Sequence, residues 1–299
     1  FEVIKNSDGI LLSMVLLSFV PEILARSYKW QIIVNMFNEK YTLKQSTETF
    51  LIGNAFGFVT PGKSGDLIKT FDLKNKTKLT LKKSVSIALF DKIIDTLILF
   101  AFGVISSILI FLKFSDITEI NNISLAVILV LAAIIIFVVL IVFSSYSKIF
   151  LNPLLFITPK RFKEKLLSLY NEFNKVSKEV KNHHRLFIYL LFDMIAWLIL
   201  FFRPFVVVVA LGLTISPVYI MLFYPLITII EILPISIMGM GSREAASILL
   251  FSLINISSEN AVAISLILIA IGMIPMIIIG FIIASKKKID FSEIKKTIT

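Results

Sequence analysis

Two carboxylates and an ammonium group stand inside one of the long apolar stretches of this chain. Asp91, Lys92 and Asp95 lie in the first half of the apolar run 84–112. Because Asp91 and Asp95 are four residues apart, their side chains share one face of a helix. Such a pair can hold a cation, share a proton, or act as an acid and a base.

Two glycine-containing breaks could bind an anion. TPGKSGDLIKTF (60–71) and GMGSRE (239–244) each follow an apolar run and combine glycines with charged residues. Free backbone amides at the start of a following helix, with the positive end of its dipole, form an anion seat. Lys63 and Lys69 would add charge to the first seat and Arg243 to the second, which suits a phosphate headgroup. Alternatively, the two lysines only determine topology, and for Lys69 we favour this alternative.

The composition is that of a helical membrane protein. Of 299 residues 57% are hydrophobic and 17% are charged, and the mean hydropathy is +0.93; charged residues make up about 25% of soluble domains. The apolar runs are long and do not alternate as membrane β-strands do. A charge at mid-membrane costs roughly 2.5–3.5 kcal/mol on insertion scales and usually pairs or faces a cavity. The buried charges therefore form either a structural ion-pair network or a relay for protons or headgroups; we leave out Glu22 and Asp193, which lie near span ends.

Composition and residue spacing argue against several classes of site. The chain has no cysteine, which excludes disulfides, thiolate metal sites and a cysteine nucleophile. His183 and His184 are adjacent and point to different sides of a helix or strand, so we expect no metal and no cofactor. The net charge of +10 reflects loop lysines that set orientation, and we expect no nucleic-acid partner.

Five full spans are expected, at 10–25, 84–112, 123–143, 186–213 and 261–284. Lysine and arginine gather in 26–44, 63–83, 146–185 and the tail after 284, which places these segments in the cytoplasm. Arg26, Lys29 and Trp30 read as an interfacial anchor at the end of the first span.

Two further apolar segments cannot cross a membrane. The run 50–59 is shorter than the about 20 residues that a helical span needs. The topology makes 50–71 enter and leave from the cytoplasmic side and 218–253 from the outer side. Residues 1–299 then form one transmembrane domain, whose inverted halves 10–112 and 186–284 are joined by the span 123–143 and the segment 146–185. The fold we expect is all-α and polytopic, with inverted repeats and two opposed re-entrant hairpins turning at Pro61, Gly62, Gly65, Pro234, Gly239 and Gly241.

Broken helices at corresponding positions of two inverted halves point to a substrate site near the midplane. The two turns should therefore lie close together. In the segment 146–185, an apolar stripe has helical spacing and is formed by Phe162, Leu166, Leu169, Phe173, Val176 and Val180. We expect a surface helix that packs on the bundle or lies among lipid headgroups; a regulatory or substrate-gathering helix is the alternative.

Four sequence blocks, in order along the chain, carry a family resemblance. They are Arg26 with Trp30, NAFGFVTPGKSGDLIKTF (54–71), LFDKIIDTLIL (89–99) and LPISIMGMGSREA (233–245). The chain resembles the membrane region of lysylphosphatidylglycerol synthases, the flippase-like domain family. It departs from the family pattern with lysine for arginine at Lys69, a shorter acid at Asp91, lysine for arginine at Lys92, and Met238 where a further glycine is common. Lysine lacks the bidentate phosphate contacts of arginine.

The resemblance implies a transporter that moves lipids with charged or glycosylated headgroups between leaflets of the plasma membrane. Its partners would be membrane lipids, anionic or polyprenyl-linked, and a homo-oligomer is left open. Because only a short tail follows Ala284, without the soluble aminoacyl-transfer domain of bifunctional relatives, we do not expect an enzyme. The residues expected to contact the headgroup are Lys63, Asp66, Lys69, Asp91, Lys92, Asp95, Arg203, Arg243 and Glu244.

Two other functions stay open. One is a membrane-embedded enzyme that modifies a lipid with Asp91 and Asp95 as its base and acid. The other is a membrane subunit without transport activity that recruits a partner through the helix at 161–181.

Overall fold

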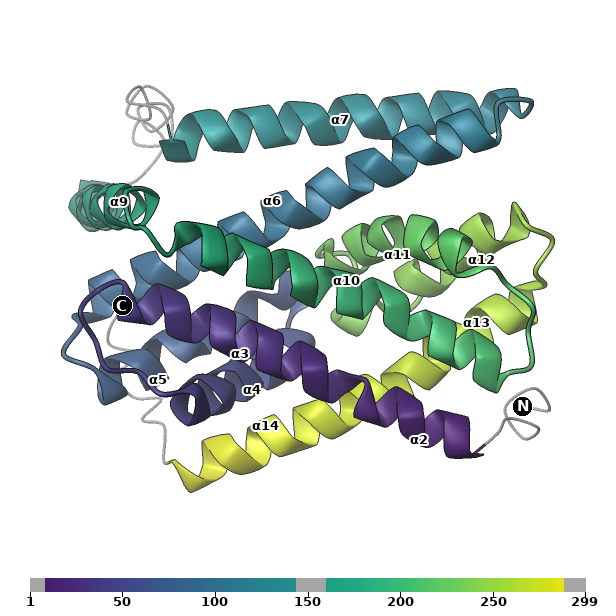
Figure 1. The fold of residues 1–299 in the computed structure, drawn as a ribbon. Coiled ribbons are helices and arrows are strands. Elements are labelled where there is room, and N and C mark those ends of the chain that lie inside the picture. The colour runs from purple at the N-terminus through teal and green to yellow at the C-terminus, as the bar shows by residue number, and fades with distance from the viewer. Residues whose placement is uncertain (1–8, 144–159, 288–299) are drawn as a thin grey trace.

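The computed structural model describes residues 9–143 and 160–287, and within these ranges every regular element is helical (Figure 1). Four helices are long and apolar enough to cross a membrane: Leu81–Lys113, Thr118–Val142, Leu186–Ala210 and Ser258–Lys286. They correspond to four of the five expected spans. The fifth is divided at Ser18 between α2 (Gly9–Leu17) and α3 (Phe19–Asn35), each shorter than the about 20 residues of a span. The chain is therefore a multi-pass membrane protein.

The long helices run along the same general direction in Figure 1, tilted against one another: α3, α6 (Leu81–Lys113), α7 (Thr118–Phe143), α10 (Leu186–Ala210), and α13 (Ser258–Ile267) continued by α14 (Ile274–Lys286). A π-helical turn, η3 (Leu268–Met273), joins the last two. Helices α3 and α10 run in opposite directions, as do α6 and α14. Corresponding helices of two inverted halves must run in opposite directions, as these two pairs do. The inverted repeat as a whole stays a prediction.

The first broken segment consists of α4 (Leu43–Phe58), the 3-10 helix η1 (Pro61–Ile68) and α5 (Lys69–Lys76). Its turn depends on Gly65, whose amide donates to Thr60 Oγ1 at 2.7 Å. A Cβ atom at this position would collide with the Phe56 carbonyl. Pro61 opens η1, and Pro is well suited to the first turn of a helix because its missing N–H would have no partner there.

The second broken segment consists of α11 (Pro217–Ile232), the 3-10 turn η2 (Ile237–Gly239) and α12 (Ser242–Ser252). Pro234 follows the end of α11. Three residues in the turn have left-handed backbones: Met238 (φ 59°), Gly239 (φ 70°) and Gly241 (φ 84°). Glycine adopts this conformation without strain, whereas other residues do so at a cost.

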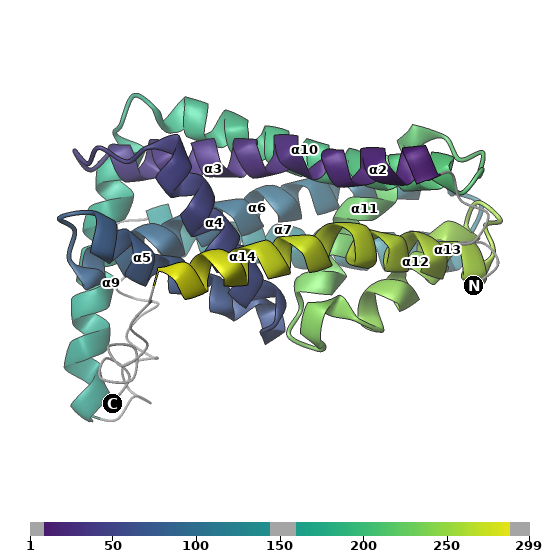
Figure 2. The ribbon, with the colours of Figure 1, turned by 90° about the horizontal axis from the view of Figure 1, so that it is seen from below.

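The two broken segments enter from opposite ends of the bundle and meet in the middle (Figure 2). Lys63 Nζ in η1 lies 3.1 Å from Glu231 Oε1 in α11. The expected proximity of the two turns is confirmed. Their depth in a membrane, and so their re-entrant character, stays a prediction.

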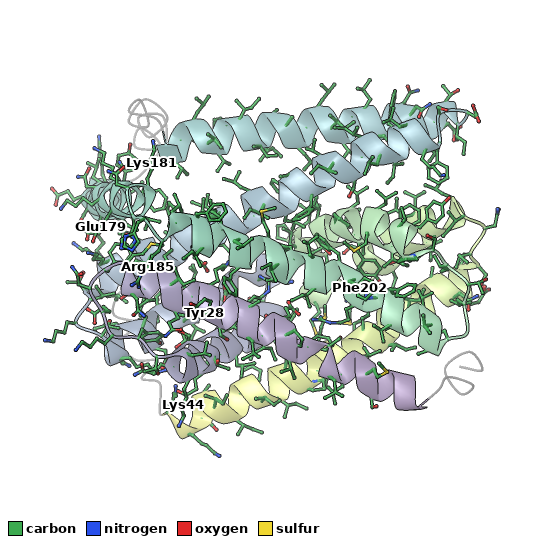
Figure 3. The ribbon with its side chains drawn as sticks, in the orientation of Figure 1. Tyr28, Lys44, Glu179, Lys181, Arg185 and Phe202 are labelled. Atoms are coloured by element: carbon green, nitrogen blue, oxygen red, sulfur yellow. The ribbon has the colours of Figure 1, made fainter. Side chains whose placement is uncertain are left out.

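Helix α9 (Lys160–Lys181) lies across one end of the bundle, perpendicular to the long helices (Figure 2). Val176 and Val180 of its stripe are fully buried, and Phe173 packs on Phe90. Figure 3 shows Lys44, Glu179, Lys181 and Arg185 at this same end, away from Phe202. The expected surface helix is present; residues 146–159, the side chain of Phe162 and the tail beyond 287 lie outside the described residues.

A cluster of ion pairs connects the end of α14 to α4 and α5. Lys287 pairs with Glu48 and lies 3.6 Å from Asp72, while Lys76 lies 2.7 Å from Asp72 and 3.4 Å from Glu48. Asp72 also accepts a hydrogen bond from Thr49 and is only 4% exposed. Removing this carboxylate leaves two ammonium groups with Glu48 as their single shared partner in this cluster.

We predict that Asp72→Asn lowers the free energy of unfolding by about 3 kcal/mol, the order expected when one partner of a buried ion pair is lost. Thermal unfolding of the purified protein in detergent measures the effect. Asp116→Asn, an exposed acid beyond α6, is the control and should leave the melting temperature unchanged. Equal melting temperatures for both variants would contradict the structural role of the cluster.

We predict that Met238→Gly raises stability by about 1 kcal/mol, because glycine relieves the left-handed backbone. Met240→Gly is the control, because the backbone of Met240 is outside the left-handed region. Glycine there relieves no strain and only makes the unfolded chain more flexible, so stability should not rise. The same unfolding measurement decides, and a loss of stability in Met238→Gly would refute the strain at this turn.

Candidate functional site

A cavity of about 140 Å³ lies where the two broken segments meet α3, α6 and α10. Its wall has an apolar part that includes Phe19, Phe50 and Leu268. The rest is charged, with seven basic and five acidic side chains: Arg26, Lys29, Lys63, Lys69, Lys92, Arg203 and Arg243, against Glu22, Asp66, Asp91, Asp95 and Glu231. This cavity contains eight of the nine residues that were expected to contact the headgroup; Glu244 is the exception.

Helix α3 supplies the first group of charges. Glu22, Arg26 and Lys29 are spaced by four and three residues and so share one face. Arg26 donates to Glu22 Oε1 at 2.9 Å and to Asp95 Oδ1 at 3.0 Å, and its guanidinium lies over Trp197. The interfacial-anchor interpretation of this region is wrong, because Lys29 is 4% and Trp30 3% exposed.

Lys29 is the centre of the carboxylate cluster. Its Nζ lies 3.2 Å from Asp91, 3.4 Å from Asp95 and 2.9 Å from Asp193. The two carboxylates of α6 therefore face one cavity and share a cation, as their spacing predicts. Helix α3 contributes that cation from a segment that was expected to lie at the membrane surface.

Lys69 at the start of α5 joins this cluster from the other side. Its Nζ lies 3.0 Å from Asp91 Oδ2 and 3.1 Å from Asp66 Oδ2, above the ring of Trp30. Lys69 is 7% exposed, so the interpretation of this residue as a topology determinant is wrong. Tyr189 donates to Asp91 Oδ1 at 2.9 Å and completes the contacts of that carboxylate.

Lys92 differs from the other basic side chains of the cavity wall. Among the described residues it is the one cation of the wall without a carboxylate within 4.0 Å. Its charged neighbours include Asp66 and Asp95, as well as Lys63 and Lys69. An ammonium group in this position can bind an additional anion without first breaking an ion pair.

Arg243 enters the cavity from α12 and is held from behind. Its guanidinium donates to Ser265 Oγ at 2.8 Å and to Glu244 Oε1 at 3.0 Å, and its Nη1 lies 3.9 Å from Glu231. Glu244 itself does not line the cavity; it accepts from the Gly241 amide and fixes Arg243. Glu231 thus stands between Arg243 and Lys63.

Arg203 takes part through Glu22, not through Asp91 or Asp95. It pairs with Glu22, donates to Ser18 Oγ at 3.2 Å and lies over the ring of Phe19. Glu22 and Asp193, both left out of the predicted site, are therefore members of its ion-pair network. The sequence contains a signal for Glu22, because it lies four residues before Arg26 and can pair with it on a helix. Only the packing of α10 on α3 reveals the role of Asp193.

The described residues contain no group of three histidine, cysteine, aspartate or glutamate side chains that could hold a metal ion. The cations of α3 and α5 lie between the carboxylates instead. The chemistry that this arrangement offers is the binding of an anion among cations whose own counter-ions are tethered nearby.

The family model of the lysylphosphatidylglycerol synthase TM region matches residues 2–280. No match to the chain was found among curated proteins or among solved structures. The family match covers the cavity and both broken segments, and the chain belongs to the lysylphosphatidylglycerol synthase transmembrane-region family.

Proposed function

We propose that this protein moves a lipid with an anionic headgroup between the two leaflets of the membrane. The observation that carries the proposal is Lys92, a cation without a carboxylate partner among the described residues, in a cavity whose other charges are paired. The family supports it, because its members have a membrane region and act on lipids.

In this mechanism the headgroup passes through the cavity while the acyl chains remain in the lipid. Lys92 binds the phosphate first, and Lys63 and Arg243 hold it from the two turns. Both of these cations also contact Glu231, at 3.1 Å and 3.9 Å, so the phosphate takes the place of a tethered carboxylate. Phospholipids and polyprenyl-linked carriers both contain a phosphate, so this mechanism suits either class of lipid.

We also propose that the plasma membrane is the location and that the end of the bundle carrying α9 faces the cytoplasm. The lysines of 74–83 and of α9 lie at this end, where Lys82 and Lys83 contact α9, and lysine and arginine are enriched in cytoplasmic loops.

The alternative as an enzyme needs one of Asp91 and Asp95 to hold a proton while the other acts as a base. Both carboxylates lie within 3.4 Å of Lys29 Nζ, which favours the ionised form of each. The ion pairs thus favour transport over acid–base catalysis at these two residues.

We predict that Lys92→Ala slows lipid movement at least about tenfold, because a charge-assisted contact to phosphate is worth roughly 1.5–3 kcal/mol. The measurement is dithionite reduction of fluorescent phosphatidylglycerol in proteoliposomes. Lys113→Ala, exposed at the far end of the same helix, is the matched control. A normal rate in Lys92→Ala would remove the residue from the pathway.

We predict that Arg243→Ala and Asp66→Ala each reduce lipid movement, since one holds phosphate and the other keeps Lys69 in place. Unchanged movement in both would overturn the transport mechanism. Mass spectrometry of the vesicle lipids accompanies the assay, and a lipid of new mass would favour the enzyme. If the wild type moves no lipid but loses its cellular role on deletion of 161–181, the protein is a recruiting subunit.

A further inference from the structure

The ion pairs around Lys29 contain more carboxylates than cations. In the described part of the chain one connected set of pairs has four cations and five carboxylates: Arg26, Lys29, Lys69 and Arg203, with Glu22, Asp66, Asp91, Asp95 and Asp193. Lys63, Arg243, Glu231 and Glu244 form a separate, balanced set. Lys92 belongs to neither set, and its positive charge balances the extra carboxylate of the first set. When an anion binds to Lys92, the extra negative charge is no longer balanced.

Asp193 is the least satisfied member of this set. It is fully buried, its Oδ1 accepts from Lys29 at 2.9 Å, and its Oδ2 has no hydrogen-bond partner among the described residues. A buried oxygen of a charged group without a donor is costly. A proton on this oxygen removes both the unsatisfied acceptor and the surplus charge.

The neighbour that favours such a proton is Asp95. Lys29 Nζ lies 3.4 Å from Asp95 and 2.9 Å from Asp193, and Asp95 has Arg26 as a second cation at 3.0 Å. Two ionised carboxylates around one ammonium group repel each other, so a proton is favoured on Asp193, which has no second cation within ion-pair distance among the described residues. Asp95 lines the cavity, whereas Asp193 lies behind it, so a proton from cavity water can reach Asp193 through Asp95.

The charged and titratable groups that influence Asp193 come from three helices, and Lys29 is the one in direct contact with it among the described residues. Lys29 and Arg26 belong to α3, Asp91 and Asp95 to α6, and Tyr189 to α10 itself. Helices α2, α11 and α13 also contact α10. The described α2 has no charged residue, Glu231 of α11 faces the two turns, and Glu259 of α13 is exposed.

We propose that Asp193 binds a proton that is taken up together with the anionic headgroup. The carboxylate gains the proton and no other bond changes. The coupling rests on the proposed function: a phosphate at Lys92 brings one negative charge into the cavity, and the proton restores neutrality. By linkage, each ligand then strengthens the binding of the other.

The proton site itself is tested without lipid. Infrared difference spectroscopy of the purified protein in detergent, over a pH titration, follows the carbonyl band of protonated carboxyl groups. We expect a band that Asp193→Asn removes and that Asp116→Asn leaves in place. A spectrum unchanged by Asp193→Asn overturns the proposal. Asp193→Asn should fold, because the amide has the size and the neutral charge of the protonated acid; if it does not, Asp95→Asn, which removes the neighbouring negative charge, must abolish the band.

The coupling is tested by adding short-chain phosphatidylglycerol to the weakly buffered protein and recording the pH. We expect uptake of about one proton per bound lipid in the wild type and none in Asp193→Asn. Lipid binding without proton uptake refutes the coupling and leaves transport intact. If neither lipid binding nor lipid movement occurs while the infrared band responds to Asp193→Asn, the proposed function fails and the proton site stands.

Discussion

The pairing of charges inside an apolar bundle is the constraint on which this structure depends. A lone charge surrounded by lipid and hydrocarbon side chains is expensive, yet seven cations and five carboxylates line one cavity. Lys29 makes this tolerable by contacting carboxylates from α6 and α10 at once. Helices α3, α6 and α10 are thereby held together by charge as well as by packing, and the cavity keeps its shape without closing.

The two broken segments bring further charges into the same cavity. A continuous helix crossing the bundle would present side chains along its whole length, whereas a turn in the middle places its backbone and one or two side chains at the centre. Lys63 in η1 and Arg243 in α12 use this geometry from opposite ends. Each turn needs an unusual backbone, which explains Gly65 at the close contact with Phe56 and the left-handed residues around Gly239.

Much of the fold was predictable because apolar length is a strong signal: four of five expected spans correspond to long helices. The meeting of the turns was predictable from topology. The roles of Arg26, Lys29 and Lys69 were not, because a basic residue after an apolar run has the same pattern at a membrane surface as in a buried ion pair. Asp193 was left out because it lies near the beginning of a span, and sequence position does not show that Lys29 reaches it. Only the packing of α3 against α10 and α6 distinguishes these cases.

Glu231 lies between the cations of the two turns, at 3.1 Å from Lys63 and 3.9 Å from Arg243. It is a built-in competitor for whatever anion those cations bind. A covalently attached rival is present at a high effective concentration, so it weakens the net affinity for every arriving anion and speeds its departure. A carrier of the kind proposed would gain from this, since a ligand bound too tightly would remain in the cavity, and the carboxylate would restore the charge balance whenever the ligand leaves.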